Sequence, residues 1–339
     1  ELAIALASIA PGDERTLATL LDRLRRNEFP ALSWKGRTVW NAFGGHAVVG
    51  LAGLLKHEND RVRSRAGHFL WQMTLKDAPR AESAVPVLIE LLGEKERRDT
   101  AADLLADIGP PARAALFRLE ALLANRNPGD DLTDVARAVA LIAPGNETAI
   151  KVLIGELKHD DPKRREWAAW DLQRIGQSAS AAVPPLIACL DDENPPVRRH
   201  ATDALGAMGS AAKSAIPALV AARYDEYEPD EVWGSEGSVY ALGEIGPDAL
   251  PSLLELLRDE MLGGKAAGAL GLMGPAAEPA VDELLGLLSE GKHPATVAAT
   301  LGEIGRGATK AVPALQKLLK DKCRYVRHAA SEALENIGG

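Results

Sequence analysis

Apolar and polar positions follow a long period that repeats over the whole chain. The last large apolar residue of each repeat recurs every 28 to 37 residues. These landmark residues are Ile9, Phe43, Met73, Ile108, Ile142, Ile175, Met208, Ile245, Met273, Ile304 and Ile337. A second signal, an apolar residue followed by proline, keeps the same period at Pro86, Pro184, Pro217, Pro251 and Pro313. Two signals with one period indicate a tandem array of small structural units.

Each unit is predicted to contain two helices. In the unit that ends at Met208, the first helix is expected over 182–192, with proline in its first turn and apolar residues at three- and four-residue spacing. The second helix is expected from Val197 to about Met208. Glycine follows most landmarks, as expected for a left-handed residue that ends a helix. No strand-like alternation occurs, so the chain is predicted to be all-α.

The second helices resemble those of HEAT-like repeats, in the short form associated with phycobilisome lyases. The family pattern is roughly VRxxAAxALGxIG, and this chain matches it over 197–209, with partial matches at Val62-Arg63, Val326-Arg327 and over 241–246. The resemblance covers essentially the whole chain. It implies a right-handed α-α superhelix, a solenoid of about ten two-helix repeats that forms a single domain over residues 1–339.

The chain opens inside a repeat. Its first residues, ELAIALASIAPG, match the second-helix segment ARAVALIAPG at Ala136–Gly145. Because arrays normally begin with a polar capping repeat, we expect a leading half repeat and a fragment of a longer chain. No apolar stretch approaches the roughly 20 residues of a membrane-spanning helix.

Charge is distributed unevenly. The net charge is −9, but residues 225–290 contain 15 acidic residues against Arg258 and Lys265, so the remainder of the chain is slightly basic. The acidic segment could attract a basic partner over long range. It could equally be a solvated surface.

No motif for catalysis or for cofactor binding is present. There is no phosphate-binding loop, no GxSxG and no HExxH, and the two cysteines, Cys189 and Cys323, lie about four repeats apart. His200 and Asp203 share one helical face, but no third metal ligand accompanies them. We therefore expect no enzyme activity, no metal and no cofactor.

An arginine follows the valine position in several second helices. It occurs at Arg63, Arg98, Arg165, Arg198 and Arg327, whereas Gly234, Gly263 and Pro294 occupy the corresponding place in the third quarter of the chain. The family resemblance implies a ladder between repeats, with the arginines bonding acids of the preceding turns such as Asp60, Asp192 and Asp321. A phosphate-binding stripe is the competing interpretation. Where the arginine is missing, the ladder is expected to be less rigid.

Aromatic residues are concentrated in the middle of the chain. Six of the ten Trp and Tyr residues lie between Trp167 and Tyr240. The positions one, five and eight residues before each landmark share a helical face, which in HEAT-like folds lines the concave surface. This face predicts a partner-binding patch made of Trp167, Trp170, Arg174, His200, Asp203, Tyr240 and Glu244. Packing of the rings between adjacent repeats is the alternative.

The longest repeat interval contains the segment YDEYEPDEVWG, residues 224–234. Insertions in repeat arrays usually form loops on one face. Tyr224, Tyr227 and Trp233 are therefore candidate loop contacts for a basic peptide, and a solvated turn is the equal alternative.

The leading functional hypothesis is a non-catalytic scaffold that binds another protein, possibly a basic one, through the concave face. A HEAT-like alkylbase glycosylase is the enzymatic alternative, because Trp167, Asp171 and Arg174 could hold a base. Its need for a basic groove disagrees with a pI near 5.4, so nucleic acid is disfavoured as a partner. A bilin-lyase-like role rests only on the resemblance.

Overall fold

The computed structural model describes residues 13–28, 34–74, 81–125, 131–222 and 236–338. These residues form helices and contain no strand, which confirms the all-α solenoid. The leading half repeat and the loop residues Tyr224, Tyr227 and Trp233 lie outside the described residues. None of the described helices is long and apolar enough to cross a membrane.

The helices divide between two compact units, residues 1–153 (unit 1) and 154–339 (unit 2). The α-helices of unit 1 are α2 (Glu14–Arg25), α3 (Trp34–Leu54), α4 (Asp60–Thr74), α6 (Val85–Leu91), α7 (Arg98–Ile108), α8 (Leu116–Ala124) and α9 (Thr133–Ile142). Helix α10 (Glu147–Glu156) contains the boundary. Those of unit 2 are α11 (Pro162–Ile175), α12 (Val183–Ala188), α13 (Pro195–Ala207), α14 (Ile216–Ala222), α15 (Glu236–Ile245), α16 (Leu250–Leu256), α17 (Gly263–Leu272), α18 (Val281–Ser289), α19 (Pro294–Ile304), α20 (Val312–Leu318) and α21 (Arg324–Gly338).

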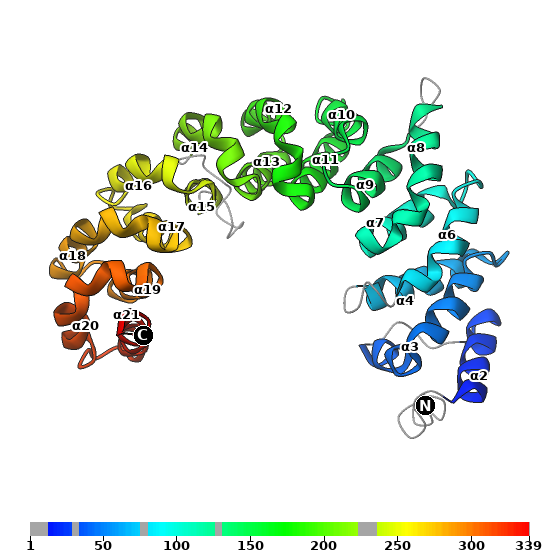
Figure 1. The fold of residues 1–339 in the computed structure, drawn as a ribbon, viewed down its shortest axis with the longest axis horizontal. Helices are drawn as coiled ribbons and strands as arrows, with labels where there is room; N and C mark the ends of the chain where they lie inside the picture. Colours follow the sequence, from blue (N-terminus) through cyan, green and yellow to red (C-terminus); the bar gives the residue numbers. More distant parts are fainter. Residues whose placement is uncertain (1–12, 29–33, 75–80, 126–130, 223–235, 339) are drawn as a thin grey trace. The chain divides into compact units, whose positions relative to one another are not determined.

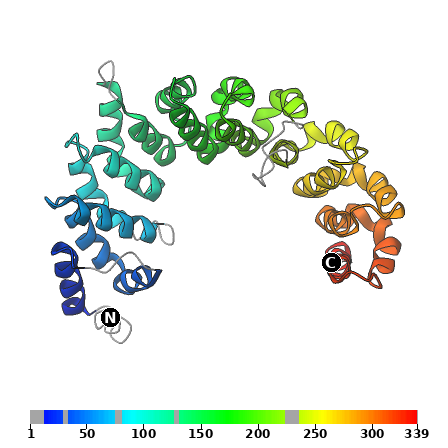
Figure 2. The same ribbon diagram turned by 180° about the vertical axis from the view of Figure 1, so that it is seen from behind.

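Unit 2 is a double layer of helices that curves along its length. The second helices of its repeats, α13 to α21, line the inside of the curve, and the first helices, α12 to α20, lie outside (Figures 1 and 2). Successive second helices pack side by side from α11 to α21. The positions of these second helices that point away from the first helices therefore form one continuous inner face of unit 2.

Glycine sets the sharp change of direction that ends most second helices. Gly109, Gly176 and Gly305 follow their helices with φ of 66°, 62° and 68° and ψ near −140°. The sign of φ agrees with the expected left-handed residue, but ψ places these glycines in the mirror image of the β region, which a Cβ atom forbids. Gly338 differs, because α21 runs through it.

A short 3-10 segment then leads into the next first helix in unit 2. Examples are η3 (Gly176–Ala182), η5 (Gly209–Ala215), η7 (Gly274–Ala280) and η8 (Gly305–Ala311). After η3, η5 and η8 the following α-helix carries proline at its second residue, as at Pro184 and Pro313, whereas α18 after η7 does not. Where the proline signal of the sequence occurs, it thus marks the start of a first helix, where the missing N–H has no helical partner.

Small and branched apolar side chains fill the space between the two layers. Leu186, Leu205, Leu219, Leu270 and Leu301 are each fully buried in unit 2. Where neighbouring second helices meet, buried alanine lies against glycine of the adjacent helix, which allows close approach of their axes. This packing places the larger polar and aromatic side chains on the surfaces.

Candidate binding surface

The predicted patch residues lie on three adjacent second helices of unit 2. Trp167, Trp170 and Arg174 belong to α11, His200 and Asp203 to α13, and Tyr240 and Glu244 to α15. Trp167 is 56% exposed and Tyr240 is 38% exposed, so neither ring is packed in the core. Trp170, His200 and Asp203 are half-buried, and Arg174 and Glu244 are exposed. We call these seven residues the inner patch.

The two tryptophans of α11 contact one another edge to face. Their ring centroids lie 6.2 Å apart with an interplanar angle of 76°. The guanidinium carbon of Arg174 lies 4.9 Å from the Trp170 ring centroid, at cation–π distance. About two turns of α11 therefore present an indole pair with an arginine of the same helix over the Trp170 ring.

His200 is an uncharged member of the inner patch at neutral pH. Burial lowers its pKa below the usual 6.5, and the neighbouring Arg199 lowers it further. Arg199 lies with Nη2 3.1 Å from His200 Nε2, so the guanidinium donates and the imidazole nitrogen accepts. Glu166 Oε1 stands 3.8 Å from the same nitrogen, beyond hydrogen-bond distance.

Asp203 and Glu244 bring two carboxyl groups together across α13 and α15. Burial raises the pKa of both, and the charge of Asp203 adds to the increase at Glu244. The Glu244 carboxylate lies over Gly206 of α13, where a Cβ atom would collide with it. The inner patch therefore includes a pair of like-charged carboxyl groups, Asp203 and Glu244, and Gly206 leaves room for the second of them.

The five predicted ladder arginines bond the backbone of their own repeats. In each, the guanidinium donates to the carbonyl oxygen six residues earlier, at the turn between first and second helix. In four of them it also reaches the carbonyl five residues earlier. At Asp192 and Asp321, Arg198 and Arg327 donate to the backbone carbonyl oxygens, and the charge of Arg198 also lowers the pKa of Asp192. Arg63 bonds the Asp60 carboxylate at 2.9 Å, as expected.

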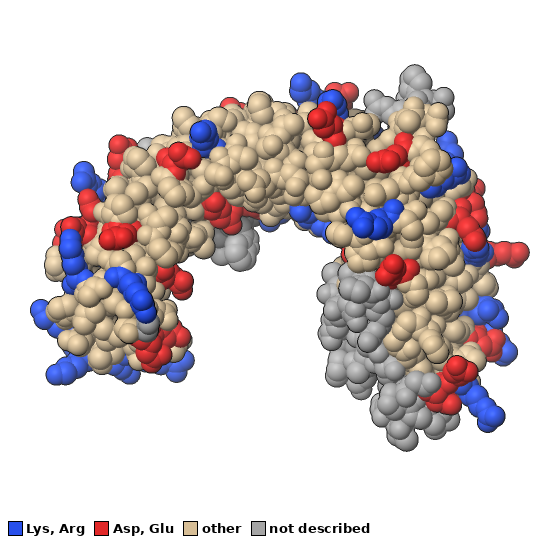
Figure 3. Space-filling model, in the orientation of Figure 1, with Lys and Arg blue, Asp and Glu red and all other residues tan. Residues whose placement is uncertain are grey.

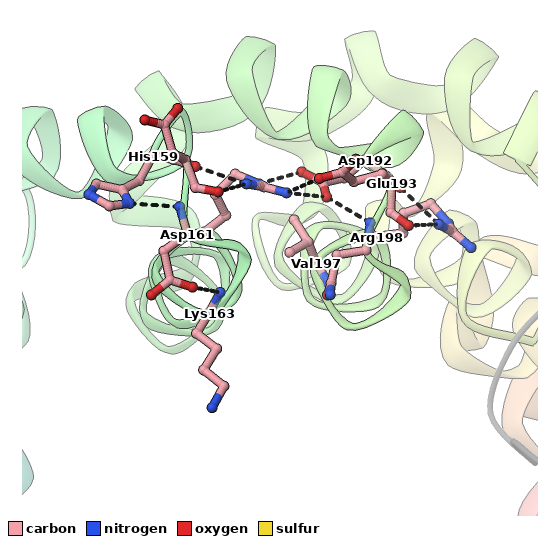
Figure 4. A network of polar contacts seen from close by, with 10 residues as sticks. His159, Asp161, Lys163, Asp192, Glu193, Val197 and Arg198 are labelled. Atoms are coloured by element: carbon pink, nitrogen blue, oxygen red, sulfur yellow. Dashed lines mark hydrogen bonds and ion pairs between the residues drawn. The ribbon is translucent and has the colours of Figure 1, made fainter.

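Arg165 makes a contact between repeats. It bonds an acid of the following repeat, whereas the ladder arginines were expected to bond acids of the preceding turns. Arg165 Nε and Nη2 donate to the two carboxylate oxygens of Asp192 in the next repeat, at 2.7 and 2.9 Å. Figure 4 shows the acceptor Asp192 beside Glu193 and Arg198, facing the turn that holds His159 and Asp161. Burial alone would raise the pKa of Asp192, but the bonds from Arg165 and from the Asn194 N–H hold it below its usual value.

Other candidate residues from the sequence are not brought into a reactive site. Asp171 of α11 is buried, with only 1% of its surface exposed, so its carboxyl group does not open onto the inner patch. Cys189 is buried and Cys323 is exposed, both as free thiols, and burial raises the pKa of Cys189 to about 11. Among the described residues, no group of three His, Cys, Asp or Glu side chains is arranged to hold a metal ion.

Two features escaped the sequence argument. Glu166 lies beside the inner patch, although it precedes Trp167 and falls outside the counted positions. In unit 1, the buried Arg137 forms ion pairs with Asp103 and Asp134, and burial, with the charges of Asp99 and Asp131, raises the pKa of Asp134 to about 6. Counting five residues back from Ile108 and Ile142 would have found Asp103 and Arg137.

The repeats and the helical double layers define an α-helical repeat protein. Models of HEAT repeats match residues 150–232 and 281–339, and a model of the PBS lyase HEAT-like repeat matches residues 236–259. Over these residues the chain contains HEAT-like repeats, as its second helices predicted. A search of curated proteins found no match to the sequence.

Solved structures support the same fold. An engineered protein is 24% identical over 99% of this chain and 98% of its own, with a TM-score of 0.50. Importin beta is 12% identical over 99% of this chain, with a TM-score of 0.56, and a Kap95:Nup1 complex is 13% identical over 99%, with a TM-score of 0.60. The chain spans only 53% and 51% of those two. At these identities the likeness concerns the fold alone.

Proposed function

We propose that the chain is a non-catalytic scaffold that binds another protein through the inner face of unit 2. The observation that carries this proposal is the continuity of the inner patch across α11, α13 and α15, with Trp167 and Tyr240 left exposed. Large aromatic side chains beside arginine are the composition of binding hot spots. Repeating helices supply the long surface on which such a patch can contact an extended partner.

The comparisons support the proposal at the level of the fold. A solenoid of this fold has been solved in the Kap95:Nup1 complex, that is, together with a second protein. The charge pattern also favours a protein partner over nucleic acid. On the face of unit 2 shown in Figure 3, basic and acidic side chains are interspersed and form no continuous basic strip. A protein that follows a phosphate backbone requires such a strip.

The glycosylase alternative is weakened by the position of Asp171. That function needs a carboxylate beside the tryptophans in an open groove, whereas Asp171 is buried, with only 1% of its surface exposed. A base held against Trp167 would meet Glu166 and His200 instead. We therefore propose protein binding, and not base excision, as the function.

The test is a selection of ligands from a displayed random-peptide library, followed by titration against defined variants. Trp167→Ala and Tyr240→Ala should each weaken the selected peptides by roughly thirtyfold, as hot-spot side chains do. Both variants should unfold close to the parent temperature, because exposed rings contribute little to the core. Tyr325→Ala is the matched control, since Tyr325 is 65% exposed on α21 of the same unit but lies outside the inner patch.

Two results would count against the proposal. Selected peptides that bind both patch variants as tightly as the parent would place the binding surface elsewhere. A large fall in the unfolding temperature of Trp167→Ala and Tyr240→Ala would show that the rings pack between repeats.

A further inference from the structure

An open cleft lies between α11 and α13 at one end of the inner patch. Its volume is about 230 Å³, and its walls are Glu166, Trp167, Trp170 and His200. Two of these four side chains are indoles, and the other two present a carboxylate and an imidazole. The cleft is large enough for one side chain of a bound peptide but not for a folded element.

The walls combine aromatic surface with a single formal charge. His200 is held uncharged by its burial and by Arg199, so Glu166 supplies the charge of the four wall residues at neutral pH. The Glu166 side chain is 30% exposed and makes no hydrogen bond to His200. Its carboxylate can therefore accept hydrogen bonds from a group that enters the cleft.

Two nearby cations are already engaged within the chain. Arg174 lies over the Trp170 ring at 4.9 Å, and Arg199 donates to His200. The first contact demonstrates that an indole of this pair accommodates a guanidinium. Trp167, the more exposed ring, offers a second surface of the same kind. The carboxyl groups of Asp203 and Glu244 continue the acidic character along α13 and α15.

We propose that this cleft receives a basic side chain of the partner, with arginine fitting best, stacked on Trp167 and hydrogen-bonded to Glu166. This inference rests on the proposed function and specifies the chemistry of the partner at one position. An indole face attracts a cation through its quadrupole. A guanidinium is planar and weakly hydrated, so it can stack on the ring and donate to a carboxylate at once.

The direct test uses small probes and needs no knowledge of the partner. N-acetyl-arginine-N-methylamide is titrated while the indole N–H resonances of the tryptophans are followed by NMR, with Trp167→Phe and Trp170→Phe identifying the two signals. N-acetyl-citrulline-N-methylamide is the neutral isostere. The arginine probe should shift the Trp167 and Trp170 signals and bind about tenfold more tightly than the citrulline probe.

Glu166→Gln is the decisive variant, because it removes the charge and keeps the size of the side chain. It should remove most of the preference for arginine over citrulline while leaving the unfolding temperature unchanged. Glu278→Gln, at an exposed position of η7, is the matched control and should keep the preference. Equal binding of the two probes to the parent chain would overturn the proposal. So would binding of single-stranded oligothymidylate at Trp167, since it would assign the cleft to nucleic-acid bases.

Selected peptides separate this inference from the proposed function. Peptides that lose binding on Tyr240→Ala, yet tolerate both arginine-to-citrulline replacement and Glu166→Gln, would leave the scaffold function standing and refute the basic anchor. Peptides that depend on Glu166 and on one basic residue would support both.

Discussion

Neighbouring repeats of unit 2 are joined in two different ways. Between α11 and α13, the link is the bidentate bond from Arg165 to Asp192 at the turns. Between α19 and α21, Gly302 approaches the backbone of Ala333 so closely that a Cβ atom would lie 2.8 Å from its Cα. Gly243 of α15 approaches the Ala269 carbonyl oxygen in the same manner. We call these the arginine-linked pair and the glycine-packed pairs.

The kind of connection between repeats affects how large the side chains on the inner face can be. The arginine-linked pair carries Trp167, Trp170 and His200 on its inner face. On α17 and α19 the corresponding positions include Gly268 and Ala299. The distance between helix axes depends on the side chains at the contact, so small residues draw helices together. A link made at the turns leaves the inner face of α11 and α13 available for large rings.

The glycine-packed pairs replace the missing arginines of the third quarter. The sequence predicted a less rigid ladder where Gly263 and Pro294 stand in place of arginine. In the structure this part has its own connections, because Thr300 Oγ1 of α19 donates to the Ala267 carbonyl of α17 at 2.7 Å in a buried position.

The largest effect is expected from breaking the arginine-linked pair. Arg165→Ala would leave the Asp192 carboxylate, whose side chain is 11% exposed, without its bidentate partner. Removing one member of a largely buried ion pair costs about 3 kcal/mol or more, mainly because the other charge stays desolvated. The free energy of unfolding in urea measures this loss.

Arg327→Ala is the matched control for that experiment. Arg327 occupies the same repeat position and bonds the carbonyl groups of Asp321 and Lys322, but it is exposed on α21. Loss of exposed hydrogen bonds of this kind should cost about 1 kcal/mol or less. An equal cost for both variants would mean that the carbonyl bonds, and not the contact between repeats, provide the stabilisation.

The period of the sequence was sufficient to predict the fold. Landmarks such as Ile175 and Met208 fixed the helix pairs, and proline and glycine fixed their ends, because these residues act through local backbone geometry. The prediction of helix faces was also local, and it placed the seven inner-patch residues on three helices that prove adjacent. Phe43 followed by Gly44 even marks a kink inside α3, where φ is 56°.

Contacts between repeats could not be predicted in the same way. Arg165 was expected to reach an acid of a preceding turn, but it bonds Asp192, 27 residues later. Which turn lies within reach depends on how each repeat is rotated against the next, and one repeat alone does not encode that rotation. The same applies to Glu166, whose place in the cleft depends on how α13 packs against α11.

A smaller effect is expected from testing the glycine-packed pairs. Gly302→Ala adds a Cβ atom against the Ala333 backbone, which cannot move aside as a flexible side chain could. Overpacking of this kind costs about 1–3 kcal/mol. Gly286→Ala is the matched control, since a Cβ atom at Gly286 of α18 meets nothing within 4 Å. That control should gain up to about 1 kcal/mol from helix propensity. Comparable stability of the two variants would show that the close approach is not needed to join these repeats.

The smallest effect concerns the contact between α13 and α15, where Glu244 lies over Gly206 beside Asp203. Burial and the charge of Asp203 raise the pKa of Glu244 above its usual 4.5 in the folded chain. The unfolded chain therefore ionises first as pH rises, and the stability of the fold declines through the range between 4.5 and the raised pKa. Glu244→Gln lacks this loss, so it should be more stable than the parent at pH 7. Because Glu244 is partly solvated, the gain should be below about 0.5 kcal/mol.

The pH dependence distinguishes this effect from a general benefit of removing surface charge. The stability difference between Glu244→Gln and the parent should vanish near about pH 3.5, where both states of the parent are protonated. Glu303→Gln, at the same repeat position of α19, controls for the loss of an exposed carboxylate. Thermal unfolding across this pH range measures both variants. A gain for Glu244→Gln that persists unchanged at low pH would mean that the amide packs better over Gly206, and that the like charge of Asp203 does not weaken the contact of α13 with α15.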